Sequence, residues 1–227
     1  MKGTLYAVGV GPGDPDLMTV KAIKTLEQAD VIACPSKEGK PGIAYGIAEQ
    51  AYANINKKEV LLCDFPMENG NISKVHKLVA QDLMKHLDAG KDIAFLTLGD
   101  PCIYSTFSYI YNMVMDSGYE VQIINGIPSF CAASAKILQP LSIGQESVLV
   151  TSGKYVDFDG TLVIMKAGSK LKSLKNEIEN SRKKVYLIEN CGMLTEQLYI
   201  GADNIPDKTG YFSILIVKPI DNYVNRG

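Results

Sequence analysis

The 227-residue sequence lacks tryptophan, contains only two histidines and has no excess of charge of either sign. Its 23 basic and 25 acidic residues give a formal net charge of −2. A chain so evenly charged gives no electrostatic reason to expect nucleic acid as a partner. No apolar run reaches the roughly 18 residues that a membrane span needs, and no secretory signal precedes the first predicted strand. We therefore expect a cytoplasmic protein without membrane contact.

Metal-binding and disulfide signatures are also missing. The chain has five scattered cysteines and no Cys-x-x-Cys pair, which predicts buried, reduced thiols rather than disulfides or a zinc site. His76 and His86 lie ten residues apart on one predicted helix. They point to different faces and cannot hold a metal together, so we expect both to be solvated surface residues. No metal ligands are predicted.

What the sequence does contain is an alternation of apolar runs with helical patterns. Strands are predicted at residues 4–10, 30–34, 59–63, 93–98 and 120–124. Their alternation with helices favours an α/β protein with a mostly parallel sheet. Pro35 is expected to end the second strand and to leave 36–42 as a loop. The second half is richer in strand, so we predict two domains, residues 1–125 and 126–227.

The first predicted strand ends in a glycine-rich corner, Gly9-Val10-Gly11-Pro12-Gly13-Asp14. Asp14 occupies the position of a helix N-cap and Pro15 that of the first helical residue, which predicts a helix to about Gln28. Such a corner brings backbone N–H groups and a helix dipole to one point, which suits a small anionic or polar ligand. It is not the dinucleotide fingerprint, because Asp14 replaces the third glycine. A capped turn without a ligand is the alternative.

A second corner, Leu98-Gly99-Asp100-Pro101, repeats this pattern at the end of another buried strand. Asp100 is again expected to cap a helix, running through Val114, with Cys102 packed beneath it. In a parallel sheet both corners lie at the carboxyl ends of strands, where ligands bind in open α/β folds. Two matching corners favour a shared crevice over two unrelated caps.

Together these motifs resemble those of the tetrapyrrole methylases. The resemblance rests on Gly9-Val10-Gly11-Pro12-Gly13-Asp14 with Leu17-Met18-Thr19, on Gly99-Asp100-Pro101 with Tyr104-Ser105, on Asn125-Gly126-Ile127-Pro128-Ser129-Phe130, and on Thr161-Leu162-Val163-Ile164-Met165-Lys166. The third motif departs from the family pattern Pro-Gly-x-(Thr/Ser)-(Ser/Ala), because Asn125 replaces the proline and Pro128 occupies the variable position. The matches span most of the chain.

Within this family, two stretches are most similar to the members that methylate C20 of precorrin-2 or cobalt-factor II. They are Ala33-Cys34-Pro35-Ser36 and the run from Phe95 to Thr106. Members that methylate C11 or C17, or uroporphyrinogen III, are the alternatives within the family. A non-catalytic protein that binds a tetrapyrrole or S-adenosyl-L-methionine (SAM) is an alternative of another class.

The resemblance implies a SAM-dependent C-methyltransferase of cobalamin biosynthesis, with S-adenosyl-L-homocysteine as product. It implies a homodimer of two α/β domains, the first with a mostly parallel sheet and the second with a mixed one, and a ligand cleft between them. The implied SAM pocket is lined by Pro12, Gly99, Asp100, Tyr104, Ser105, Ser129, Phe130, Met165 and Lys166. The Gly-Pro-Gly-Asp loop is implied to face the tetrapyrrole, which would bring any cobalt with it.

The implied reaction places limited demands on side chains. A meso carbon of a reduced tetrapyrrole is itself a nucleophile, so the enzyme mainly has to align it with the sulfonium methyl group and exclude water. No essential nucleophilic side chain is predicted, and we hypothesise that Asp14 or Tyr104 assists the loss of the proton after methylation. The substrate is a polycarboxylate, so cations should surround the crevice. The candidates are Lys21, Lys37, Lys40, Lys166 and Lys170.

Overall fold

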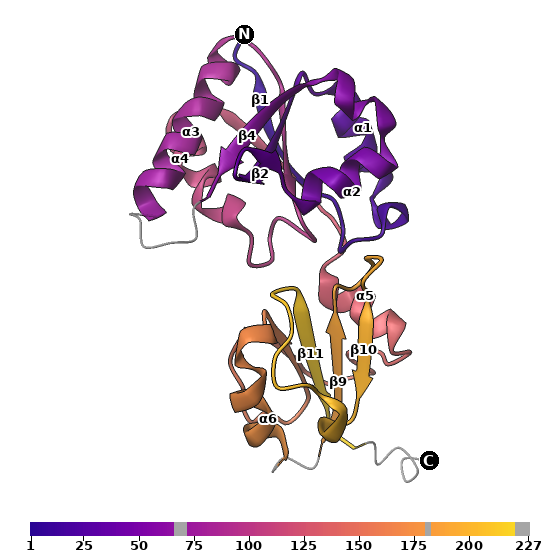
Figure 1. The fold of residues 1–227 in the computed structure, drawn as a ribbon. Coiled ribbons are helices and arrows are strands. Elements are labelled where there is room, and N and C mark those ends of the chain that lie inside the picture. Colours follow the sequence, from indigo (N-terminus) through magenta and orange to yellow (C-terminus); the bar gives the residue numbers. More distant parts are fainter. Residues whose placement is uncertain (66–71, 180–182, 221–227) are drawn as a thin grey trace. The chain divides into compact units, whose positions relative to one another are not determined.

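The computed structural model describes residues 1–65, 72–179 and 183–220 of the chain. The chain divides into two compact units, Met1–Pro128 and Ser129–Gly227, each with its own β-sheet (Figure 1). None of the helices in the described ranges is both long enough and apolar enough to cross a membrane.

The first unit is built on a six-stranded sheet with helices on both faces. Its strands are β1 (Thr4–Gly9), β2 (Val31–Lys37), β3 (Lys40–Pro41), β4 (Glu59–Asp64), β5 (Ile93–Thr97) and β6 (Glu120–Ile124). Its helices are α1 (Val20–Gln28), α2 (Ile43–Ala51), α3 (Ile72–Asp88) and α4 (Tyr111–Asp116), with 3-10 turns at η1 (Pro15–Leu17), η2 (Ala53–Lys57) and η3 (Thr106–Tyr109). All the strand pairs are parallel except the β2–β3 hairpin, which confirms the mostly parallel sheet.

Strand β1 lies between β5 and the edge strand β6 in this sheet. Its side chains alternate between two fully buried cores: Leu5 and Ala7 belong to the core with α3 and α4, and Val8 to the core with α1 and α2. Helices that cover both faces of a parallel sheet leave only the strand ends open to ligands. The carboxyl edge of the sheet is therefore where a site is to be sought.

Strand β2 does not end at Pro35, so that prediction was wrong. The strand continues to Lys37 and forms a hairpin with β3, within what was expected to be a loop. Glu38 and Gly39 both have positive φ, 53° and 73°, as the favoured two-residue hairpin turn requires. Strand β5 pairs with β2 only as far as Ala33, so the missing N–H of Pro35 interrupts no ladder on that side.

The helices that were expected directly after the two corners do not begin there in the structure. After the first corner the helix is split into the three-residue turn η1 and α1, because Thr19 caps α1 by accepting a hydrogen bond from Ala22 N (3.1 Å). After the second corner a loop comes first, and η3 begins at Thr106. Ser105, not Asp100, caps that turn, by accepting from Phe107 N (3.1 Å).

The second unit contains a five-stranded sheet in the order β10-β9-β11-β8-β7. Its strands are β7 (Val148–Ser152), β8 (Thr161–Met165), β9 (Lys184–Glu189), β10 (Gln197–Ile200) and β11 (Ser213–Lys218); its helices are α5 (Ser129–Lys136) and α6 (Leu171–Glu179), with 3-10 turns at Gly168–Lys170 and Ala202–Asn204. Strand β7 is parallel to β8, whereas β11 is antiparallel to both β8 and β9, so the sheet is mixed as expected. Apolar residues of α6 pack on one face of this sheet.

Candidate active site

The two glycine corners of the first unit are hydrogen-bonded to each other. Gly11 N donates to Gly99 O (3.2 Å) and Gly99 N donates to Gly11 O (2.7 Å), which forms an isolated antiparallel bridge. The corners follow β1 and β5, which are parallel neighbours in the sheet. They therefore lie side by side at its carboxyl edge, as the matching sequence patterns predicted.

Three glycines bring the ends of β1, β5 and β6 into backbone contact at this edge. A Cβ atom on Gly126 would lie 2.1 Å from Gly99 O, and one on Gly9 would lie 2.5 Å from Gly126 N. Neither position has room for a side chain. Gly126 thus belongs to the same constellation as the two corners, although the sequence showed it only as part of a separate turn.

The Asp100 carboxylate is buried and bound by three donors, and its residue is only 6% exposed. Its Oδ1 accepts a hydrogen bond from Cys102 N (2.8 Å). Its Oδ2 accepts from Gly126 N (3.0 Å) and from Asn125 Nδ2 (3.2 Å). Asp100 therefore joins the end of β5 to the end of β6, where the sequence had predicted a helix cap.

The Asp14 side chain is placed quite differently. It is half-buried and accepts one hydrogen bond, from Asp16 N (2.9 Å), so it caps the turn η1 as predicted. Pro12, two residues earlier, is buried. Because only a three-residue turn follows, the first corner does not lie at the N-terminus of an α-helix, and the expected helix dipole is absent there.

The loop between Asp100 and η3 carries the next two predicted site residues, Tyr104 and Ser105. Tyr104 is 48% exposed and has a φ of 47°, a left-handed conformation that is rare for an aromatic residue. Such strain persists where the surrounding structure enforces it, often at functional sites. Ser105 is buried. Cys102 is exposed in this loop, and the prediction that it packs beneath a helix was wrong.

In the second unit, the strands β7, β8 and β9 run in the same direction, so their carboxyl ends lie at one edge of the sheet. The residue that follows each strand has a positive φ: Gly153 after β7 (58°), Lys166 after β8 (55°) and Asn190 after β9 (52°). The Lys166 ammonium lies 5.6 Å from the ring centroid of Tyr211, within cation–π range. Asn190 was not identified from the sequence, although asparagine directly after a strand is a known signal for left-handed backbone.

The nine residues implied to line the SAM pocket are divided between the units. The first unit carries Pro12, Gly99, Asp100, Tyr104 and Ser105 on the two corners and the loop after β5. In the second unit, Ser129 and Phe130 begin α5, and Met165 and Lys166 stand at the end of β8; all four are half-buried.

The histidines and cysteines form no metal site within the described ranges. His76 is 7% exposed and stacks on Tyr109, with ring centroids 5.0 Å apart, so the prediction of a solvated His76 was wrong. Burial lowers the pKa of His76. Cys34, Cys63 and Cys191 are buried as expected, whereas Cys102 and Cys131 are exposed. Burial raises the pKa of the Cys34 thiol to about 11, which makes it a poor nucleophile.

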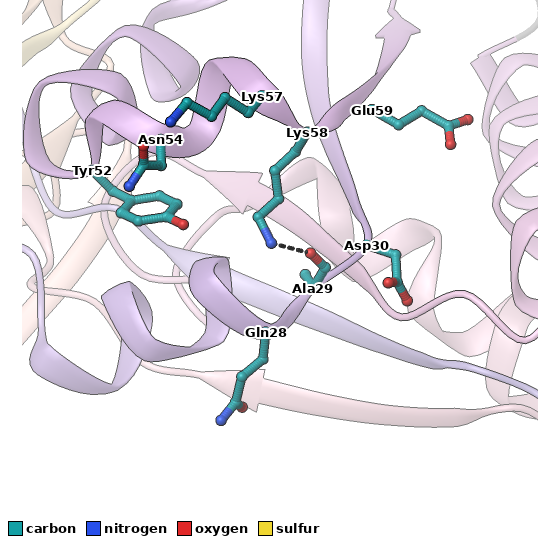
Figure 2. Close-up of a pocket in the computed structure, with 8 residues that line it drawn as sticks. All are labelled: Gln28, Ala29, Asp30, Tyr52, Asn54, Lys57, Lys58 and Glu59. Atoms are coloured by element: carbon teal, nitrogen blue, oxygen red, sulfur yellow. Dashed lines mark hydrogen bonds between the residues drawn. The ribbon is translucent and has the colours of Figure 1, made fainter.

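An open pocket of about 420 Å³ lies at the opposite edge of the first sheet, near the amino ends of β2 and β4 (Figure 2). It is lined by Gln28, Ala29, Asp30, Tyr52, Asn54, Lys57, Lys58 and Glu59. Lys58 Nζ donates to Glu27 O (2.7 Å) and Ala29 O (2.6 Å) at the end of α1. This lysine therefore satisfies the terminal carbonyls of a helix, a structural role.

Comparison with known proteins gives a consistent result. The model of the family described as tetrapyrrole (corrin/porphyrin) methylases matches residues 4–202. The chain is 34% identical over 226 residues to a Methanocaldococcus jannaschii protein named as a probable cobalt-precorrin-2 C(20)-methyltransferase, covering 94% of this chain and 95% of that protein. It is 27% identical to the precorrin-2 C(20)-methyltransferase of Sinorhizobium sp, covering 95% of each.

The fold is likewise similar to solved structures. Uroporphyrin-III C-methyl transferase from Thermus thermophilus, solved in complex with S-adenosyl homocysteine, superposes with a TM-score of 0.71 and 20% identity. The superposition covers 95% of this chain and 92% of that one. The two-unit α/β fold expected from the sequence is confirmed by this likeness.

Proposed function

Because the chain belongs to the tetrapyrrole (corrin/porphyrin) methylase family, we propose that it transfers a methyl group from SAM to C20 of precorrin-2 or of its cobalt-containing counterpart. This is a step of cobalamin biosynthesis. The observation that carries the proposal is the similarity over almost the full length of both chains to a relative named for this ring position. The Sinorhizobium relative is named for the same position.

The proposed SAM pocket consists of Pro12, Gly99, Asp100, Tyr104, Ser105, Ser129, Phe130, Met165 and Lys166. The groups present fit such a ligand. The Gly11–Gly99 bridge offers a backbone surface without side chains, and Tyr104 exposes about half of its surface. When bound, SAM supplies an electrophilic methyl group on a sulfonium centre. The residues of this chain then have to orient the methyl group toward the macrocycle and exclude water.

The Gly-Pro-Gly-Asp loop is proposed to face the tetrapyrrole, with Asp14 or Tyr104 assisting the loss of the proton that leaves C20. Asp14 Oδ1 is engaged by Asp16 N, which fixes the carboxylate and leaves Oδ2 to take the proton. The Tyr104 hydroxyl is the second candidate, carried on an exposed side chain. We further propose that the enzyme works as a homodimer in the cytoplasm.

The test is incubation with methyl-labelled SAM and, separately, precorrin-2 and its cobalt form, followed by mass spectrometry and NMR of the product. One added methyl group at C20 is the expected result, and the preferred macrocycle identifies the substrate. A methyl group at C11 or C17 would reassign the ring position. Binding of both ligands without transfer would favour a non-catalytic binding protein.

The role of Asp14 and Tyr104 is tested with Asp14→Asn and Tyr104→Phe under saturating substrate. Removing the proton acceptor is expected to lower kcat by about 10²-fold or more. If both variants keep near-normal turnover, neither side chain accepts the proton.

A further inference from the structure

Ser36 carries an unsatisfied buried hydroxyl near the carboxyl end of β2. Its Oγ is the one fully buried side-chain nitrogen or oxygen that lacks a hydrogen-bond partner in the described part of the chain, and the residue is 8% exposed. A buried hydroxyl without a partner lowers the stability of a folded protein. A ligand that accepts its hydrogen bond would account for its presence.

The position of Ser36 on β2 directs this hydroxyl toward α2. Alternate side chains of a strand share a face, so Ser36 lies on the same face as Ile32 and Cys34. Those two residues belong to the core that includes Ala44 and Ile47 of α2. Gly42 N, at the start of α2, donates a hydrogen bond to Pro35 O (2.9 Å), the residue of β2 directly before Ser36, so the start of α2 lies beside this part of the strand.

The N-terminus of α2 has no side-chain cap. Its N-cap residue is Gly42, no side chain accepts a hydrogen bond from its first turn, and that turn contains no acidic residue. A Cβ atom at position 42 would lie 2.8 Å from Pro35 O, so a capping serine or aspartate cannot be accommodated. Gly42 N already donates to Pro35 O, and Tyr45 N donates to Gly42 O (3.0 Å). This nine-residue helix therefore presents the N–H groups of Ile43 and Ala44, and the positive end of its dipole, beside Ser36.

This helix end lies at the same edge of the sheet as the two glycine corners. Strand β4 pairs with one side of β2 along Val31–Ser36, so β3 pairs on the other side, beyond the point where β5 stops. Helix α2, which follows β3, contacts both β5 and the turn η1, which directly follows the first corner. The free helix end and the proposed crevice therefore belong to one region of the first unit.

The β2–β3 hairpin adds positive charge to this region. Lys37 and Lys40 are both exposed and directly opposite each other in the hairpin register, an arrangement of like charges that destabilises a strand pair. The register places them on the face opposite to Ser36. They therefore contribute to the binding of a ligand at α2 through their positive electrostatic potential rather than through a direct hydrogen bond.

We propose that the N-terminus of α2 and the Ser36 hydroxyl form a subsite for a carboxylate group of the tetrapyrrole. This inference rests on the proposed function. A carboxylate accepts hydrogen bonds from backbone N–H groups and from a hydroxyl, and it removes the unsatisfied state of Ser36. The methionyl carboxylate of SAM has the same chemistry, but α2 contacts the turn η1, which directly follows the loop proposed to face the macrocycle.

The test uses Ser36→Ala in the full chain. We expect the KM for the tetrapyrrole and the Kd for uroporphyrin III, a stable polycarboxylate measured by fluorescence, to rise about tenfold. The kcat and the affinity for S-adenosyl-L-homocysteine, measured by calorimetry, should not change. The Tm should stay the same or rise, because the variant loses an unsatisfied hydroxyl. The control is Ser117→Ala, directly after α4, whose hydroxyl already donates to Met113 O (2.8 Å).

Lys37→Ala and Lys40→Ala should each weaken uroporphyrin III binding about two- to threefold at low ionic strength, and less in salt. Lys57→Ala, at the opposite edge of the sheet, is the matched control. Unchanged tetrapyrrole KM and uroporphyrin Kd in Ser36→Ala would overturn the proposal, and so would a loss confined to S-adenosyl-L-homocysteine. If wild type binds uroporphyrin III through Ser36 yet methylates neither macrocycle, the proposed function fails and the subsite stands.

Discussion

The two corners of the first unit share a Gly-Asp-Pro pattern, but their aspartates make different hydrogen bonds. Asp14 is half-buried and caps a three-residue turn with one hydrogen bond. Asp100 is almost fully buried and binds two backbone N–H groups and one side-chain amide. The chain after Asp14 turns helically at once, whereas the chain after Asp100 passes through a left-handed Tyr104 first.

The difference shows how context decides the role of a short motif. An aspartate before proline is a good N-cap when the next residues are free to turn. At the second corner Oδ1 makes the equivalent local hydrogen bond, from Cys102 N, and Oδ2 accepts in addition from the Asn125–Gly126 segment. Asp14 thus stabilises only its own turn, whereas Asp100 also stabilises the contact between two strand ends.

The largest effect is expected for Gly126→Ala. Its Cβ would lie 2.1 Å from Gly99 O, and only a backbone shift relieves that overlap. We expect a loss of about 3 kcal/mol or more in the free energy of unfolding, measured with urea. Gly11→Ala is the matched variant at the first corner: with a φ of 78° and a Cβ 3.2 Å from Leu17 O, it should cost about 1–2 kcal/mol. Equal losses would contradict the tighter packing at the second corner.

The next effect is expected for Asp100→Ala, which leaves three donors without their acceptor. A loss of about 2–3 kcal/mol is expected, together with weaker binding of S-adenosyl-L-homocysteine in calorimetry. Asp100→Asn should lose less, because its single amide oxygen can still accept from Gly126 N. Asn125→Ala, which removes one of the three donors, should lose least. A different order among these variants would show that the carboxylate does not join the two strand ends.

A smaller effect on stability is expected for Asp14→Ala. Only the hydrogen bond from Asp16 N is lost, which costs about 1 kcal/mol or less in thermal unfolding. Turnover should fall much more than stability if the carboxylate accepts the proton. A loss of stability as large as that of Asp100→Ala would remove the distinction between the corners.

The smallest effect on stability is expected for Tyr104→Gly. Glycine relieves the left-handed strain at φ 47°, worth about 1 kcal/mol, which offsets the contacts that the ring loses. The Tm should therefore change little while methyl transfer falls sharply. Tyr104→Phe, which keeps the strain and the ring, separates the contribution of the hydroxyl. A Tm drop as large as that of Asp100→Ala would indicate that Tyr104 is chiefly structural.

Much of the fold could be predicted from local patterns. Strands β1, β5 and β6 are rich in apolar residues and are closely followed by glycine or asparagine, so their positions agree with the predicted ranges within a few residues. The β2–β3 hairpin was missed because Pro35 was treated as a strand terminator. Pro35 is accommodated by the register in which β2 pairs with β4, and this register depends on the tertiary structure, which local sequence patterns do not show.

The candidate site was predictable only in part. The adjacency of the two corners followed from the parallel sheet, but the three donors to Asp100 come from residues 2 to 26 positions away. His76 was expected in solvent because the aromatic residues that cover it, Phe65 and Tyr109, come from other segments. The sequence does not show that the Ser36 hydroxyl lacks a hydrogen-bond partner, because that depends on which groups lie near it in the folded chain.

The position of β1 between two strands that follow it in the chain has a consequence for synthesis on the ribosome. Its two neighbours, β5 and β6, follow it in the chain by 84 residues or more, counting from Gly9 to Ile93. At about 5–20 residues per second, roughly 4–18 s pass between translation of β1 and completion of β5. During that time the nascent strand has no native partner on either side. The glycine corner that is translated first is therefore among the last parts of the unit to take its final form.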